Sequence, residues 1–195
     1  MIYSFVRKVI HFIKIETMKG VVFTEFIEMV ESQFGDEVLE QIIEKANLPH
    51  NAEYTAVGSY PHEELVSLVL ELSTESNVPV PDLLKAYGKH FFGILGKSYA
   101  SMISDVKDGF ELFQKLENYI HVEVKKLYPE AELPKFDTEW EGDSLVMYYQ
   151  SSRKLGDFAH GLIEGCLEHF DQQASITQHP LNKDGTRVKF TLTPH

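Results

Sequence analysis

The sequence is almost without cysteine. Cys166 is the only one in 195 residues, and a single thiol can form neither an internal disulfide nor a cysteine-rich zinc site. The chain is therefore not a disulfide-stabilised secreted protein, and a reducing cytoplasm suits it. Because Cys166 falls within a helical pattern, we expect it to contribute to packing rather than to redox chemistry.

Positive charge is also scarce. The chain has 18 Lys and Arg against 30 Asp and Glu, which gives a net charge of −12 at pH 7. Proteins that bind nucleic acid need clustered basic side chains to neutralise phosphates, so nucleic acid is excluded as the main partner. An acidic surface is typical of a solubility device, and it also suits a protein partner with a basic face.

Long uninterrupted apolar runs are missing. The nearest is the first 17 residues, MIYSFVRKVIHFIKIET, which Arg7, Lys8 and Lys14 interrupt. That run is too short and too charged for a transmembrane helix, and it has no cleavage site of a signal peptide. Two interpretations remain: residues 1–17 are an amphipathic N-terminal extension, or the start is mis-assigned and the protein begins at Met18, which we favour. We expect residues 18–195 to form a single domain, with no membrane partner.

What the chain has in quantity is apolar and aromatic side chains, 43% apolar with 13 Phe and 9 Tyr, enough for a core. Up to Pro134 the apolar positions recur at three and four residues, which predicts helices, and after it β-formers alternate. Helices are predicted within 21–48 (broken at Gly35-Asp36, with Asp36 as N-cap) and over 83–95, 110–128 and 155–170. A further helix is predicted to open at Tyr60-Pro61, with Pro61 in its first turn. An extended linker is predicted over 78–82, and strands within 135–150, 174–180 and 187–193. The fold class is therefore α+β, a helical N-terminal subdomain packed on a C-terminal antiparallel sheet with an inserted helix.

One short stretch carries a distinctive set of polar groups. Tyr149, Ser151 and Arg153 alternate along a predicted strand, so in an extended chain their side chains point to the same side. Two hydroxyls and a guanidinium in a row form a receptor for carboxylate or phosphate. The spacing alone is equally typical of a solvated sheet face, and the residues alone leave open a binding module for some carboxylate ligand.

The same three residues match the Tyr-x-Ser-x-Arg signature of the H-NOX (haem–nitric oxide/oxygen binding) family, and further landmarks agree in order. Met18-Lys19-Gly20 resembles the usual start of these domains, and residues 118–129 around His121 resemble the proximal-histidine helix. Pro134 sits where the family has a proline pressed against the porphyrin, and residues 161–165 resemble the helix after the signature. The resemblance extends from residue 18 to about residue 193.

This resemblance implies haem b bound between the helical subdomain and the sheet. Tyr149, Ser151 and Arg153 would hold its two propionates, and His121 would be the axial ligand of the iron, a role in which neutral imidazole is common. Of the nine histidines, only His121 combines a helical setting, an apolar border and the family match. His160 is a minor competitor, and because His160 and His169 lack the i,i+4 spacing of a metal pair, zinc is not expected.

The resemblance also bears on which gas binds. Members of the family that bind O₂ donate a hydrogen bond to it from a tyrosine, and Phe158 occupies that position here. Phe26 and Phe91 are apolar where such members have polar partners, and Val22 and Leu162 complete the expected wall. A pocket without donors withholds stabilisation from O₂, which gains partial negative charge when bound. We therefore expect binding of NO and CO and little stable binding of O₂, unless the nearest polar side chains, Tyr87 or His90, turn inward.

By resemblance the protein is a haem-based gas sensor and not an enzyme. The 195 residues leave no room for an effector domain, so a separate partner is expected; bacterial stand-alone members commonly pair with a histidine kinase or a cyclic-di-GMP enzyme. Four alternatives stay open at this point: an O₂-binding member of the family, a haem enzyme, which would need distal acid–base groups, a carboxylate-binding module without haem, and a redox sensor that uses Cys166.

Overall fold

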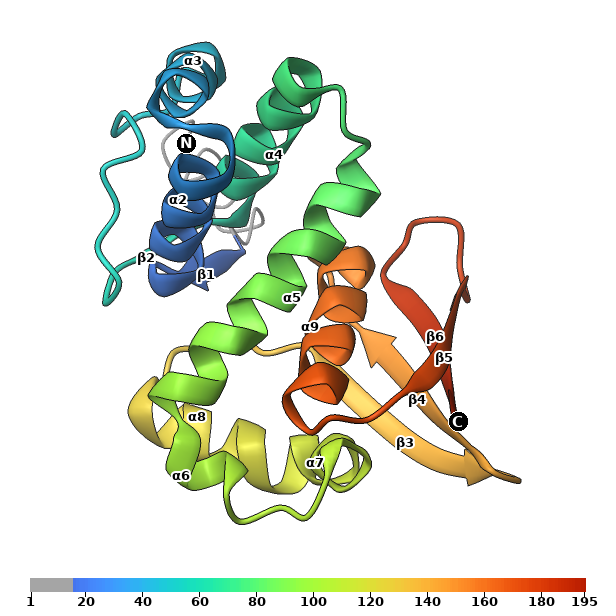
Figure 1. The fold of residues 1–195 in the computed structure, drawn as a ribbon. Helices are drawn as coiled ribbons and strands as arrows, with labels where there is room; N and C mark the ends of the chain where they lie inside the picture. The colour runs from blue at the N-terminus through green and yellow to red at the C-terminus, as the bar shows by residue number, and fades with distance from the viewer. Residues whose placement is uncertain (1–15) are drawn as a thin grey trace, which may run out of the picture.

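The computed structural model describes residues 16–195 (Figure 1). The expected N-terminal extension, residues 1–17, lies outside the described residues except for Glu16 and Thr17. None of the helices in residues 16–195 is long and apolar enough to cross a membrane.

The N-terminal part consists of helices around one apolar cluster. Its elements are β1 (Thr17–Lys19), α2 (Val21–Phe34), α3 (Asp36–Ala46), β2 (Ser59–Pro61), α4 (His62–Ser76) and α5 (Val80–Ser98). β1 and β2 form a two-stranded antiparallel sheet. The helices bury their three- and four-residue stripes against one another, as amphipathic helices do, and the fully buried side chains include Phe23, Phe26, Ile42, Leu68, Leu72 and Tyr87.

The C-terminal part combines short helices with a sheet. It contains α6 (Ala100–Ile103), α7 (Gly109–Lys115), the π-helical turn η1 (Leu116–Ile120), α8 (His121–Leu127), β3 (Lys135–Glu141), β4 (Ser144–Gln150), α9 (Gly156–His169), β5 (Ala174–Pro180) and β6 (Arg187–Pro194). The four strands are antiparallel in the order β3-β4-β6-β5. The alternation along β6 buries Val188, Phe190 and Leu192, and this face packs in one cluster with the apolar side of α9.

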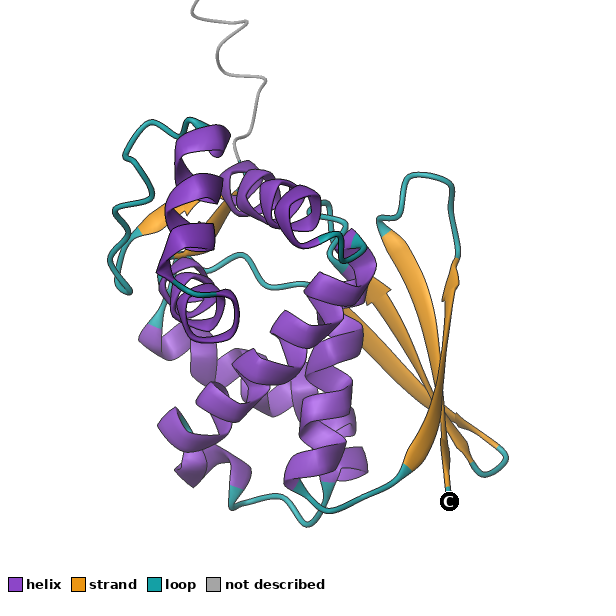
Figure 2. Cartoon of the chain, turned by 45° about the horizontal axis from the view of Figure 1, so that its top comes forward, coloured by secondary structure: helices purple, strands orange, loops and turns teal. Residues whose placement is uncertain are grey.

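Two long helices, α5 and α9, lie side by side in the middle of the molecule, with α9 between α5 and the sheet (Figure 1). Glycines allow their backbones to touch: a Cβ at Gly161 would lie 2.0 Å from the carbonyl oxygen of Lys85, and one at Gly88 would lie 2.2 Å from that of Phe158. Leu162 of α9 packs against both the N-terminal and the C-terminal apolar clusters. The helices occupy one side and the sheet the other (Figure 2), so the α+β architecture is confirmed.

Three local predictions were wrong. Asp36 is the first residue of α3, and the N-cap is Gly35, whose φ of 87° favours glycine. The linker expected at 78–82 ends earlier, because Pro81 fits into the first turn of α5, where its missing N–H costs no helical hydrogen bond. Tyr60-Pro61 pairs with β1 as a strand before α4 begins.

The helix expected over 110–128 is interrupted by the π-helical turn η1. A π turn holds one residue more than an α turn and so rotates every later side chain by about 100° around the axis. Leu116 and Ile120 pack against the C-terminal core. Leu127, which an uninterrupted α-helix with a period of 3.6 residues would place on the same face as Leu116 and Ile120, is instead 55% exposed. The turn ends directly before His121.

Candidate functional site

The imidazole of His121 is held through one of its nitrogens, and the other has no partner among the described residues. Its Nδ1 lies 3.0 Å from Oε1 of Glu117, one helical turn earlier, and its side chain is 13% exposed. Burial lowers the pKa of His121, and the carboxylate of Glu117 offsets this only in part. Nε2 has no hydrogen-bond partner among the residues that the structure describes. Such an imidazole, fixed through one nitrogen and free at the other, has the usual arrangement of a metal ligand.

Glu117 joins the helix to the sheet. The same Oε1 that contacts His121 accepts the backbone N–H of Phe136 at 2.7 Å, at the start of β3. Sequence reasoning overlooked this residue, although a Glu four positions before a His on a helix is a recognisable signal.

One aromatic ring separates His121 from Tyr149. The ring centroids of His121 and Phe136 are 6.2 Å apart, and those of Phe136 and Tyr149 are 5.4 Å apart. Phe136 and Tyr149 are also paired across β3 and β4. The pairing of β3 with β4 therefore places Tyr149, the first residue of the signature, beside the ring that contacts His121.

The extended row expected for Tyr149, Ser151 and Arg153 was wrong in shape. β4 ends at Gln150, and the chain then turns, with the backbone N–H of Arg153 donating to Oγ of Ser151 at 3.3 Å. The turn nevertheless gathers the three side chains. Burial raises the pKa of Tyr149, while the neighbouring Ser151 hydroxyl and the positive charge of Arg153 act in the opposite direction. Tyr149 also accepts the N–H of Leu155, the residue before α9, at 3.2 Å.

Arg153 bridges two segments that lie far apart in the chain. Its Nη1 donates to the carbonyl oxygen of Thr17 in β1 at 2.8 Å, and its Nη2 donates to the carbonyl oxygen of Glu132. Pro134, two residues after Glu132 and directly before β3, is partly buried. Backbone carbonyls carry no net charge, so they do not neutralise the guanidinium of Arg153. Its positive charge can therefore still attract an anionic group.

The aromatic side chains expected on the distal side come together around Tyr87. The ring centroid of Tyr87 lies 5.2 Å from that of Phe26, 5.8 Å from that of Phe91 and 5.1 Å from that of Phe158. Tyr87 is fully buried, and its hydroxyl donates to the carbonyl oxygen of Val22. We call these four rings, Phe26, Tyr87, Phe91 and Phe158, the aromatic cluster.

Two further residues border the aromatic cluster. Val22 and Leu162 are partly buried and pack against the N-terminal core. His90, the other polar residue of concern, is partly buried and interacts electrostatically with Glu25 of α2.

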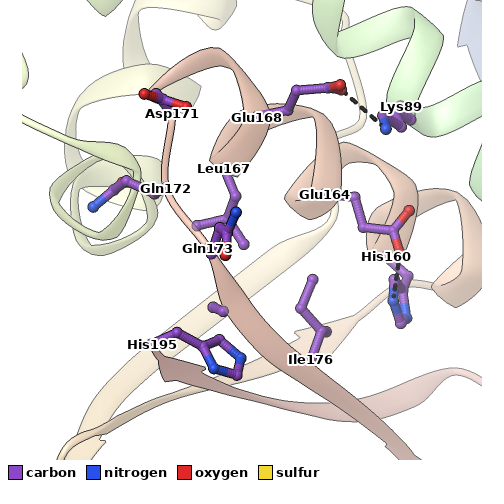
Figure 3. Close-up of a pocket in the computed structure, with 11 residues that line it drawn as sticks. Lys89, His160, Glu164, Leu167, Glu168, Asp171, Gln172, Gln173, Ile176 and His195 are labelled. Atoms are coloured by element: carbon purple, nitrogen blue, oxygen red, sulfur yellow. Dashed lines mark ion pairs between the residues drawn. The ribbon is translucent and has the colours of Figure 1, made fainter.

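His160 lies in a different part of the fold. It lines a cleft of about 640 Å³ between α5, α9 and β5 (Figure 3), to which none of the other residues discussed above contributes. Its Nδ1 is 2.7 Å from Oε1 of Gln178, and its Nε2 is 3.3 Å from Oε1 of Glu164. Both nitrogens of His160 therefore face oxygens of neighbouring side chains. No group of three His, Cys, Asp or Glu side chains in residues 16–195 is placed to hold a metal ion.

The donor set fits a flat group that is apolar in its body, carboxylated at one edge and metal-bearing at its centre. The imidazole nitrogen of His121 that has no partner among the described residues suits the metal. The Arg153 charge with the Tyr149 and Ser151 hydroxyls suits the carboxylates, and the aromatic cluster suits the body. Haem has these properties, and the residues present fit it.

Comparison with known proteins gives one consistent result. Residues 19–178 match the family model described as "Haem-NO-binding". The Fe(II) unliganded H-NOX protein from K. algicida is 41% identical, with a TM-score of 0.87 over 91% of this chain and 97% of that one. The Fe(II)NO H-NOX protein from S. oneidensis is 28% identical, with a TM-score of 0.83 over 91% and 99%. The H-NOX from Shewanella woodyi, solved in the Fe(II)CO state with IWP-051 bound, is 41% identical, with a TM-score of 0.78 over 91% and 95%.

Proposed function

The chain belongs to the Haem-NO-binding (H-NOX) family, a family of haem-based gas sensors, and from that premise we propose that it senses NO at ferrous haem b, also binds CO, and binds little O₂. The observation that carries the choice of gas is the hydroxyl of Tyr87, the only hydroxyl in the aromatic cluster, which already donates to the carbonyl oxygen of Val22. The O₂-binding alternative has no comparable support.

Each part of the site has a role in this proposal. Nε2 of His121 would ligate the iron on one side, and the Tyr149 and Ser151 hydroxyls with the Arg153 guanidinium would hold the propionates. Pro134 would press on the macrocycle, and the distal wall would be formed by Val22, Phe26, Phe91, Phe158 and Leu162. Haem, when bound, would supply a ferrous iron with one position open to a diatomic gas.

In this proposal the aromatic cluster discriminates between gases because it offers no free hydrogen-bond donor to a bound ligand. Bound O₂ carries partial negative charge and gains several kcal/mol from an aimed donor, on the order of the value of one oxyanion-hole hydrogen bond. The Tyr87 hydroxyl is engaged and the Phe158 ring has no donor. NO needs no such donor, and two relatives were solved in the Fe(II)NO and Fe(II)CO states.

Signalling would run through the contacts that tie the site to the rest of the fold. Release of His121 would free Glu117, and with it the bond from Glu117 to the Phe136 N–H of β3. The Arg153 bridge connects the same region to β1. A two-state shift of these contacts would be read by a separate partner, a histidine kinase or a cyclic-di-GMP enzyme in a reducing cytoplasm; the protein itself would act as a sensor and not as an enzyme.

The test is an absorption spectrum of the ferrous protein under nitrogen, air, CO and NO. We expect a Soret band that air leaves unchanged and that CO and NO shift. The Phe158→Tyr variant places a hydroxyl in the aromatic cluster and is expected to give an oxygen-bound spectrum in air. A stable oxygen-bound spectrum in the wild type would overturn the choice of gas, and a protein that shows no Soret band after haem is added would overturn the proposal as a whole.

A further inference from the structure

We propose that Glu117 is a positioning residue that sets the strength of His121 as an iron ligand, by fixing the imidazole ring and by lending it negative charge. The inference rests on the proposed function, because it requires haem at His121. It concerns a residue that the resemblance to the family does not assign.

The geometry fixes both the tautomer and the orientation of the ring. A carboxylate can only accept, so the contact of 3.0 Å places a proton on Nδ1 of His121, and in the neutral imidazole the lone pair is then on Nε2. Because Oε1 of Glu117 also accepts the Phe136 N–H at 2.7 Å, the carboxylate is held from a second element. The imidazole is therefore fixed relative to both η1 and β3.

The charge of Glu117 is directed at His121. Among the residues that the structure describes, Glu117 forms no ion pair with a Lys or Arg, whereas Glu123, two residues after His121, pairs with Lys126. His121 is the more buried partner, with 13% of its side chain exposed against 32% for Glu117. A carboxylate that accepts the N–H of a ligating histidine makes the opposite nitrogen a stronger donor, and loss of such a partner commonly costs about 10- to 100-fold in metal affinity.

The π-helical turn gives this pair its place in the fold. Glu117 lies inside η1 and His121 directly after it, so both ends of the contact belong to the segment where the helical register changes. Turns of this kind occur frequently at functional sites. A movement of His121 would therefore first change its contact with the Glu117 carboxylate, and through that carboxylate the hydrogen bond to the Phe136 N–H at the start of β3.

Three variants separate charge from contact. Glu117→Gln keeps an oxygen that can accept both N–H groups but removes the charge. Glu117→Ala removes both. Glu123→Gln is the matched control, because Glu123 has a similar exposure of 28% in its side chain and pairs with Lys126 instead of His121.

The readouts are the iron–histidine stretching band in the resonance Raman spectrum of the ferrous protein, the reduction potential, and the rate at which NO displaces His121. For Glu117→Gln we expect a lower stretching frequency and a higher potential than in the wild type. For Glu117→Ala we expect a further decrease, a broader band, and displacement faster by about tenfold. Glu123→Gln should match the wild type in all three.

The outcomes distinguish this inference from the proposed function. A wild-type protein without a Soret band, or without an iron–histidine band, contradicts the proposed function. A wild type with both bands, and a Glu117→Gln variant whose band and potential are unchanged, overturns the role of Glu117 alone. If Glu117→Ala fails to fold, Glu117→Gln decides the question, since its amide oxygen can still accept the Phe136 N–H.

Discussion

At the scale of single residues, Cys166 shows how burial lowers the reactivity of a thiol. Its side chain is fully buried, and burial, with the nearby Asp108 charge as a smaller cause, raises the pKa of the thiol well above its ordinary value. The thiolate is the nucleophile, so the folded protein at pH 8 should react with iodoacetamide far more slowly than the protein in denaturant. Mass spectrometry of the alkylated chain measures both rates.

The same shift has a consequence for stability. An acid with a raised pKa in the folded state stabilises that state fully below the unfolded pKa, about 8.5 for a thiol, and the contribution is lost as pH rises above it.

Rapid alkylation of Cys166 in the folded protein would contradict its assignment to the core and would revive the redox-sensor alternative.

The signature residues show what a sequence pattern can and cannot predict. Spacing indicated Tyr149, Ser151 and Arg153 as one group, and the structure brings them together. Their arrangement depends on a distant segment. Gln150 pairs with Arg187, the first residue of β6, and the last backbone contact on that side is the Ser151 N–H, which donates to the carbonyl oxygen of Thr186 at 2.9 Å. Where a strand ends is decided by its neighbour, and no local pattern contains that information.

At the scale of elements, the contact between α5 and α9 depends on the absence of side chains. A methyl group at Gly161 would lie 2.0 Å from the carbonyl oxygen of Lys85, a backbone atom that cannot move aside. We expect Gly161→Ala to reduce the free energy of unfolding by about 1–3 kcal/mol, the usual cost of overpacking. Urea unfolding followed by far-UV circular dichroism measures it.

Gly93 offers the matched control. It also lies within a helix, α5, but nothing comes within 4 Å of a Cβ placed there. Gly93→Ala should raise the free energy of unfolding by about 0.5–1 kcal/mol, because alanine loses less backbone entropy on folding. Equal midpoints for the two variants would mean that the helices do not approach as closely as the structure has them.

The elements that could be predicted were those with a regular period. The helices α2, α3, α4 and α9 followed from apolar spacing, and the sheet followed from the alternation of β-formers after Pro134. The π-helical turn did not, because a period of 3.6 fits the residues before and after it equally well. The exposed Leu127 marks where that assumption failed.

At the scale of the whole molecule, the site depends on parts that are distant in sequence. The aromatic cluster draws on α2, α5 and α9, while His121 and Glu117 depend on η1 and β3. Sequence patterns could name the members by resemblance and give the fold class, but the Glu117 contact to Phe136 and the Arg153 bridge to Thr17 span 19 and 136 residues. Contacts of that range follow from the packed fold alone.

Haem that binds among these parts must stabilise them together, because a ligand that binds only the folded state raises its stability by mass action. With free haem at about 100 times its dissociation constant the gain is about 2.7 kcal/mol, which in a domain of this size raises the unfolding midpoint by about 5–10 °C. Arg153→Lys keeps the charge but loses the planar guanidinium. We expect this substitution to weaken haem binding about tenfold, which makes the stabilisation by haem smaller by about 1.4 kcal/mol.

The matched control is Arg187→Lys, the same substitution at an exposed residue of β6, which should leave the haem-induced shift unchanged. Differential scanning calorimetry of the three proteins, with and without haem, gives both quantities needed. Because Arg153 also bridges Thr17 and Glu132, its variant should unfold at a lower temperature even without haem, so the haem-induced difference and not the midpoint itself is the measure of propionate binding. An equal difference in all three proteins would confine Arg153 to the bridge and leave the propionates to Tyr149 and Ser151.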